Sequence, residues 1–217
     1  MTRRILFLLL SILFLQCEDP TPNVSSNFRV TIQNLSSGEI ATDLSKGIFL
    51  IKNEGFPLYF TGAQDYGQGL EQLAEDGYVT RLVENLQAND LVLAVDSFDL
   101  IPPGESISFE FNASYGAFLN FATMFTDSND LFYSFNDDGI LLFNPDGSPR
   151  KGDVTSLVWL WDLGTEINEP PYEGIFQAAS QSAPNEGEDE NSQMRLVNDG
   201  FTYPPRTSVI QVTVNPI

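Results

Sequence analysis

The chain has 217 residues, of which 30 are Asp or Glu and 10 are Lys or Arg, so its formal net charge is −20. A surface this acidic repels phosphate backbones, and nucleic acid is therefore not expected as a partner. The sequence contains no His and a single Cys, which excludes Ser-His-Asp and Cys-His catalytic sites and an intrachain disulfide, and disfavours zinc.

Residues 1–16 have the pattern of a secretory signal peptide. Arg3 and Arg4 precede an apolar run from residue 5 to residue 15, which is too short to span a bilayer. Cys17 follows directly, as in bacterial lipoproteins, in which this thiol is acylated and attaches the protein to a membrane. We therefore predict lipidation at Cys17 and a place in the bacterial cell envelope, at the outer membrane or the cell surface. An ordinary signal peptide with a chance cysteine is the alternative.

A polar tether over residues 17–27 is predicted to connect the lipid to one domain over residues 28–217. Within the domain, stretches with alternating or continuous apolar residues predict strands. In chain order these are 28–32, 47–51, 91–95, 107–111, 118–125, 155–161 and 208–214.

Two short helices are expected between the second and third of these strands. In 67–77, Leu70, Leu73 and Ala74 share one helical face and Gly77 can end the helix, and 78–86 forms the second helix. Many strands, two short helices and turn-rich links predict an all-β fold with the architecture of a β-sandwich.

The segment 177–199 differs in composition from the rest of the domain. It contains N-E-G-E-D-E-N-S, which has no apolar residue and several like charges. We expect a solvated, disordered loop.

Carboxylates stand just after two of the predicted strands. Asp130 follows the run that ends at residue 125, and Asp162 and Glu166 follow the strand that ends at residue 161, with Gly164 able to turn the chain back between them. Three clustered carboxylates repel one another unless a cation lies between them. Calcium takes roughly six to eight oxygen ligands, so we predict a calcium site formed by Asp130, Asp162 and Glu166.

Other interpretations of the acidic residues remain open. Asp130 and Asp162 could instead cap turns by accepting hydrogen bonds from backbone N–H groups. Asp127 and Asn129 are additional candidate ligands. The D-D-G and N-P-D-G sequences at 137–139 and 144–147 are more simply hairpin turns than calcium loops.

The aromatic residues near these carboxylates also allow two interpretations. Trp159 and Trp161 alternate onto one face of the strand expected over 155–161, and with Phe132 and Tyr133 they could form a ligand platform. Burial of at least one of the two indoles in the core is the simpler interpretation.

Five sequence blocks follow one another in a specific order. They are F-R-V-T-I-Q-N-L-S at 28–36, G-L-E-Q-L-A-E-D-G at 69–77, P-G-E-S at 103–106, M-F-T-D-S-N-D-L-F at 124–132 and W-D-L-G-T-E-I-N at 161–168. Together they resemble the spondin domain, the N-terminal module of F-spondin and mindin, which also occurs alone in bacterial secreted proteins. The resemblance implies an eight-stranded antiparallel β-sandwich, similar to a C2 domain, with a calcium-type site at one end. In the animal proteins the module is tied to extracellular matrix and integrin binding.

The chain departs from the animal members of that family at three points. Leu131 replaces a tryptophan, Glu166 stands where many members have Asp, and the animal cysteines are missing. Glu166 keeps the charge but lengthens the reach of the carboxylate, so the metal would either sit differently or bind more weakly.

The function predicted from the sequence is a lipid-anchored, envelope-facing binding or adhesion module with a calcium site, without catalytic activity and with a protein or glycan ligand. The first alternative is a structural or accessory envelope lipoprotein, in which the metal only stabilises loops. The second is a glycan hydrolase that uses Asp162 and Glu166 as a carboxylate pair, whose members would have to lie about 5–9.5 Å apart.

Overall fold

The structure, a computed structural model, describes residues 24–217. The signal peptide predicted over 1–16, lipidation at Cys17 and the tether as far as residue 23 lie outside the described residues. The first strand begins at Ser25, inside the segment expected to be tether.

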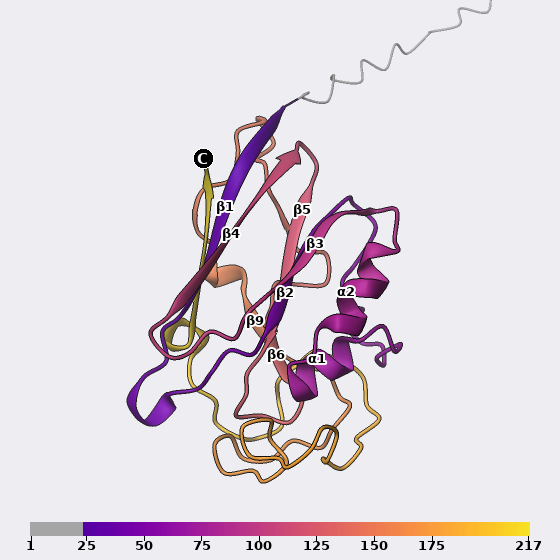
Figure 1. The fold of residues 1–217 in the computed structure, drawn as a ribbon, viewed down its shortest axis with the longest axis vertical. Helices are drawn as coiled ribbons and strands as arrows, with labels where there is room; N and C mark the ends of the chain where they lie inside the picture. Colours follow the sequence, from indigo (N-terminus) through magenta and orange to yellow (C-terminus); the bar gives the residue numbers. More distant parts are fainter. Residues whose placement is uncertain (1–23) are drawn as a thin grey trace, which may run out of the picture.

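Two antiparallel β-sheets face each other and confirm the predicted all-β sandwich (Figure 1). The first sheet has the strand order β4-β1-β11-β8. It consists of β4 (Ser106–Ser114), β1 (Ser25–Asn34), β11 (Ile210–Pro216) and β8 (Gly152–Asp153).

The second sheet has the strand order β10-β9-β6-β5-β2-β3, with β7 paired to β5. Its strands are β10 (Arg195–Leu196), β9 (Trp159–Asp162), β6 (Leu131–Ser134), β5 (Phe118–Met124), β2 (Gly47–Lys52), β3 (Val92–Phe98) and β7 (Ile140–Leu141). The described chain therefore has eleven strands where eight were expected. Three of them, β7, β8 and β10, are only two residues long, and 11 − 3 leaves eight longer strands.

The strand expected over 155–161 begins later than predicted. Residues Thr155–Leu157 form a 3-10 turn, η2, and β9 starts only at Trp159. The Asp153 side chain accepts a hydrogen bond of 2.8 Å from the Thr155 backbone N–H, and this local bond holds the chain in a turn. Two further 3-10 turns, η1 (Gly38–Ile40) and η3 (Arg206–Ser208), lie in connections, and the second delays β11 to Ile210.

Both predicted helices are present and cover the outer face of the second sheet (Figure 1). They are α1 (Leu70–Asp76) and α2 (Thr80–Gln87), and Gly77 ends α1 with a φ of 69°. The helices bury Leu73 and Leu82 against Leu50 and Trp161. Strand β2 is consequently buried on both faces, which explains why its sequence is a continuous apolar run rather than an alternating one.

The main core fills the space between the two sheets. Alternate residues of β1, among them Phe28 and Val30, point into it and meet Phe49 and Phe121 of the second sheet. Both predicted turns are found, since Gly139 and Gly147 donate hydrogen bonds of 2.9 Å to the carbonyls three residues before them. The turn at 144–147 is closed by an antiparallel bridge between Phe143 and Pro149, whereas the turn at 137–139 joins β6 to β7, which both pair with β5, and so is not a hairpin. Within residues 24–217, no helix has the length and apolar character needed to cross a membrane.

The chain between β9 and β11 forms irregular loops at the end of the sandwich opposite the start of β1 (Figure 1). The expectation that 177–199 is a disordered loop is wrong, although several of its acidic residues are exposed as predicted. Backbone hydrogen bonds of 2.7 Å run from Glu190 to Thr165 and from Ser192 to Gly164, and Met194 is buried. The segment therefore forms a fixed cover over the residues that follow β9.

Replacing Phe121 with Ala should test the main core. Phe121 is 1% exposed and packs edge to face on Phe135 with ring centroids 5.0 Å apart. Phe121→Ala should lower the free energy of unfolding by about 3–5 kcal/mol because it leaves a cavity. Phe60→Ala, at a residue that is 50% exposed, should change it by only about 0.5 kcal/mol. Urea denaturation of both variants measures this, and equal losses would contradict the assignment of the core.

Candidate functional site

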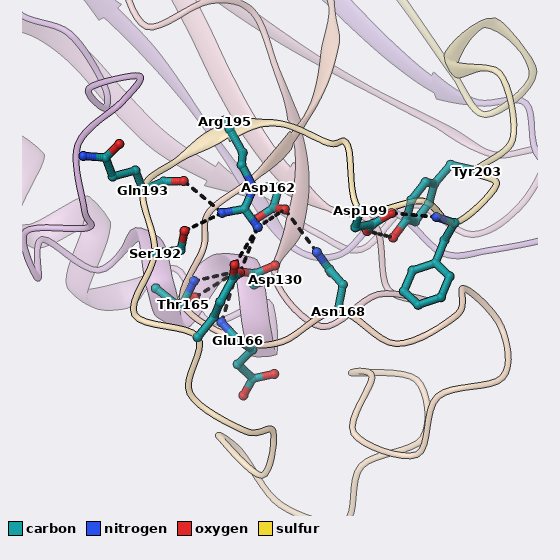
Figure 2. A network of polar contacts seen from close by, with 12 residues as sticks. Asp130, Asp162, Thr165, Glu166, Asn168, Ser192, Gln193, Arg195, Asp199 and Tyr203 are labelled. Carbon is teal, nitrogen blue, oxygen red and sulfur yellow. Dashed lines mark hydrogen bonds and ion pairs between the residues drawn. The ribbon is translucent and has the colours of Figure 1, made fainter.

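Asp130 and Asp162 meet at one end of the second sheet. Asp130 immediately precedes β6 and Asp162 is the last residue of β9, and the two strands pair with Leu131 opposite Asp162. Because adjacent antiparallel strands bring the start of one to the end of the other, both carboxylates lie at the same edge (Figure 2). Both side chains are completely buried.

One oxygen of Asp130 is fully engaged with the backbone and the other is not. Oδ2 accepts hydrogen bonds from the backbone N–H groups of Thr165, at 2.7 Å, and Glu166, at 3.2 Å. Oδ1 is buried and has no hydrogen-bond partner among the described residues. Burial, followed by the charge of Asp162, raises the pKa of Asp130 to about 7, while the backbone hydrogen bonds act in the opposite direction.

Asp162 shows the same division between its two oxygens. Its Oδ2 forms an ion pair of 2.8 Å with Arg195 and accepts a hydrogen bond of 3.1 Å from Asn168. Its Oδ1 has no partner in the described part of the chain, and neither has Oδ1 of Asn168. Burial raises the pKa of Asp162 to about 6, and the Arg195 charge limits this rise.

Glu166, the third predicted ligand, is placed differently. Its backbone N–H contacts Asp130, but its carboxylate points away from Asp130 and Asp162 (Figure 2) and accepts a hydrogen bond of 3.1 Å from the Gly187 backbone. Burial raises the pKa of Glu166 to about 7. Within residues 24–217, no group of three or more His, Cys, Asp or Glu side chains is arranged to hold a metal ion. The structure thus brings two of the three predicted carboxylates together and not the third.

Arg195 is the component of this site that the sequence analysis missed. It lies on β10 opposite Asp162. Its guanidinium contacts Asp162 and donates a hydrogen bond of 2.7 Å to the Ser192 hydroxyl (Figure 2). It also donates to both carboxylate oxygens of Glu190, at 2.8 and 2.9 Å. The only signal was a basic residue beside a strongly acidic stretch, and the pairing of a two-residue strand cannot be derived from such a pattern.

Glu75 is a second residue that the sequence analysis missed. It lies on α1, is 3% exposed, and has its pKa raised to about 8 by burial. The charges of Glu166, Glu71 and Asp130 raise that pKa further, whereas the Thr165 hydroxyl lowers it. The sequence signal for its burial was its position in G-L-E-Q-L-A-E-D-G, directly after the apolar residues Leu73 and Ala74 of α1. Buried carboxylates therefore extend from the sheet end to the neighbouring helix.

The donor atoms of the site suit a hard cation. Asp130, Asp162 and Asn168 each hold one buried oxygen without a partner among the described residues. An unsatisfied buried polar atom costs about 1–3 kcal/mol, and more when it is charged. Carboxylate and amide oxygens are the ligand types that calcium takes, so the chemistry of these three donors suits the metal that the sequence predicts. The turn-capping interpretation also holds for Oδ2 of Asp130, so the two interpretations apply to different oxygens of one residue.

The additional candidate ligands do not join this set. Asn129 uses its side-chain oxygen to accept a hydrogen bond of 2.9 Å from the Glu169 backbone. Burial raises the pKa of Asp127, and the side chains that also shift this pKa are Thr42 and Asp43, not Asp130 or Asp162.

A polar cavity of about 270 Å³ lies beside the carboxylates. It is lined by Asp65, Glu71, Thr165 and Asp189, among other polar residues, and not by Asp162 or Glu166. Since those two side chains are 0% and 1% exposed, the geometry lends no support to their use as a hydrolytic pair.

Comparison with models of known protein families and with curated proteins finds no match for this chain. The resemblance to the spondin domain therefore stays a prediction.

Gly164 should be essential for the turn that carries the Thr165 and Glu166 N–H groups to Asp130. It has a φ of 77°, and a methyl group there would lie 3.0 Å from Ser192 and 3.1 Å from Gln193. Gly62 has a φ of 83° and open space around it, so Gly62→Ala should lower the free energy of unfolding by about 1–2 kcal/mol, through backbone strain alone. Gly164→Ala should lower it by about 1–3 kcal/mol more, because the new methyl group also crowds the backbone of Ser192 and Gln193. Denaturant unfolding compares them, and equal costs would contradict this description of the loop.

The metal-free protein should become less stable as the pH rises from about 4 to about 8. Asp130, Asp162, Glu166 and Glu75 all have folded-state pKa values above the value of about 4 expected in the unfolded chain. Between those values the folded state binds more protons than the unfolded state, so the free energy of unfolding falls with rising pH.

Urea denaturation in EDTA at several pH values measures this slope. Asp130→Asn should make the slope shallower, whereas Asp90→Asn, at an exposed position, should leave it unchanged. A stability that rises over the same pH range in EDTA would contradict the prediction.

Proposed function

We propose that the protein is a lipid-anchored, envelope-facing binding module of the spondin type whose acidic end holds calcium through Asp130 and Asp162. The observation that carries this proposal is the pair of buried carboxylates at neighbouring strand ends, each with one oxygen that has no partner among the described residues. Asn168 supplies a third such oxygen. No catalytic step is part of the proposal.

The position of the site in the domain supports a binding role. The chain enters the described domain at Ser25, at one end of the sandwich, and the loops that follow β9 lie at the opposite end (Figure 1). A lipid at Cys17 would hold the first end near the membrane, so the acidic loops would face outward. Loops at the end of a rigid scaffold are the usual place for a binding site.

Calcium at this site would supply positive charge to oxygens that lack it. Asp130 already fixes the backbone of Thr165 and Glu166, and Asp162 already fixes Arg195. These residues therefore connect the ends of two strands to the loop after β9 and to the acidic cover segment. Calcium bound to Asp130 and Asp162 would strengthen these connections. The loops would then form an ordered surface that a protein or glycan ligand could contact.

Arg195 favours a second candidate function. Its guanidinium lies 2.8 Å from Asp162 and already provides a positive charge in the site. If this internal ion pair is enough to compensate the buried charge of Asp162, the acidic end only stabilises loops. The protein is then a structural or accessory envelope lipoprotein. The two candidates differ in whether calcium controls partner binding or only thermal stability.

The calcium site is tested by thermal unfolding of the purified full-length protein in EDTA and during a calcium titration. A ligand that binds only the folded state adds about 2.7 kcal/mol at 100 times its Kd. For a domain of this size, that should raise Tm by roughly 5–11 °C. Asp130→Asn should abolish the rise, and Asp90→Asn, at an exposed position, should keep it. If calcium does not raise Tm, or raises it equally in Asp130→Asn, the proposed calcium site is wrong.

The binding role is tested separately on arrays of envelope glycans and extracellular matrix proteins, with calcium and with EDTA. Binding that EDTA removes, and that Asp162→Ala loses while its circular dichroism spectrum is retained, supports the binding module. Calcium-dependent stability without calcium-dependent binding would instead support the structural lipoprotein.

A further inference from the structure

A second hollow lies at the other end of β9 from Asp162. Its volume is about 370 Å³, and its lining includes Phe118, Asp138, Leu141, Arg150, Leu157 and Trp159. Trp159 and Trp161 share one face of β9 because side chains alternate along a strand. Trp161 is covered by the helix side of the sheet, whereas Trp159 is 40% exposed. The hollow is therefore the part of the outer sheet face that the helices leave open.

Cations gather around this hollow in a chain that has few of them. The described residues contain eight Lys and Arg, since two of the ten in the sequence are Arg3 and Arg4. Arg150 lines the hollow, the Arg206 guanidinium stacks on the Trp159 ring at 4.5 Å, and the Lys52 ammonium lies 5.0 Å from the centre of the Phe118 ring. One of the eight, Arg150, therefore lines the hollow, and two more, Arg206 and the buried Lys52, lie against its aromatic lining residues Trp159 and Phe118.

None of these three cations forms an ion pair within residues 24–217, although acidic side chains far outnumber basic ones. The Arg150 Nε donates a hydrogen bond of 2.5 Å to the Leu141 carbonyl, and this is its only side-chain hydrogen bond to the described residues. The bond holds the guanidinium at the rim and leaves its two Nη groups available. A guanidinium with two parallel donors binds a carboxylate in a bidentate manner.

The remaining lining residues indicate which kind of ligand molecule would present a carboxylate to Arg150. Trp159 offers a flat apolar ring, and Arg206 fixes its orientation through the stacking contact and a hydrogen bond of 3.1 Å to the Ser156 carbonyl. Asp138 and Asn136 line the same hollow and can exchange hydrogen bonds with hydroxyl groups. An aromatic wall with a few converging polar groups is the composition of a small-ligand site.

We propose that this hollow binds an acidic saccharide, with a sugar ring on Trp159, its carboxylate on Arg150 and its hydroxyl groups on Asp138 and Asn136. The volume of about 370 Å³ lies within the range of about 300–1,000 Å³ that is usual for small-ligand pockets. Asp138 accepts hydrogen bonds from hydroxyl groups, of which a saccharide carries many on each ring and a bare phosphate has few. The net charge of the chain acts only weakly over this distance, because the Debye length at physiological salt is about 8 Å. The site does not depend on calcium at Asp130 and Asp162.

The proposal is tested by isothermal titration calorimetry on the purified full-length protein, in EDTA. The probe is a tetrasaccharide of alternating glucuronic acid and N-acetylglucosamine, and the matched neutral control is the tetrasaccharide of N-acetylglucosamine. We expect saturable binding of the acidic probe, with an affinity at least about tenfold higher than that of the neutral one. Arg150→Gln should lower the affinity by about tenfold or more, and Arg29→Gln, on the first sheet, should leave it unchanged.

Trp159→Leu provides a second variant if Arg150→Gln alters the fold, because Trp159 is exposed and its loss should also weaken binding about tenfold. Retained circular dichroism and Tm identify the variants that are folded. Equal binding of the two saccharides, or no binding of the acidic one, overturns the proposal. Binding to phosphatidylglycerol vesicles that Arg150→Gln removes, without saccharide binding, also overturns it and assigns the surface to a membrane.

Discussion

Two carboxylates buried side by side impose the constraint on which the acidic end of this domain depends. Moving an ionised carboxylate from water into a protein interior costs several kcal/mol unless it is paired and hydrogen-bonded. Asp130 is compensated by two backbone N–H groups and Asp162 by Arg195, and each keeps one oxygen without a partner among residues 24–217. The protein has therefore gathered negative charge that its own described groups satisfy only in part.

The rest of the fold accounts for how this arrangement is held. Pairing of β6 with β9 fixes the two carboxylates at one sheet end, and the turn at Gly164 brings backbone donors back to the first of them. The acidic segment after residue 177 then closes over the turn through backbone hydrogen bonds and delivers Arg195 to the second. At the other end of β9, the same sheet leaves Trp159 partly exposed, so one strand connects the acidic site with a hollow that Arg150 lines.

Much of this could be predicted from sequence, because the relevant patterns are local. Apolar runs identify strands, and Asp130 and Asp162 were predicted to lie at strand ends. Strand β6, whose pairing with β9 brings the two carboxylates together, was not predicted. The remainder depends on contacts between distant segments. Arg195 comes from a two-residue strand within a stretch whose composition is typical of disorder, and the direction of Glu166 is decided by the Gly187 backbone. The late start of β9 follows from the hydrogen bonds that Thr155 makes with Asp153 and with the Val212 backbone, which strand propensity does not register.

The most direct test of the cation site is a pair of crystal structures of the protein, one grown with calcium and one with EDTA. We predict density for a metal ion within about 2.3–2.6 Å of the carboxylate oxygens of Asp130 and Asp162 in the first crystal only. Arg195 should then be displaced from Asp162 or share that carboxylate with the ion. Crystals grown with calcium that show no ion there, with Arg195 still paired to Asp162, would contradict the calcium site and identify the arginine as the cation that Asp162 binds.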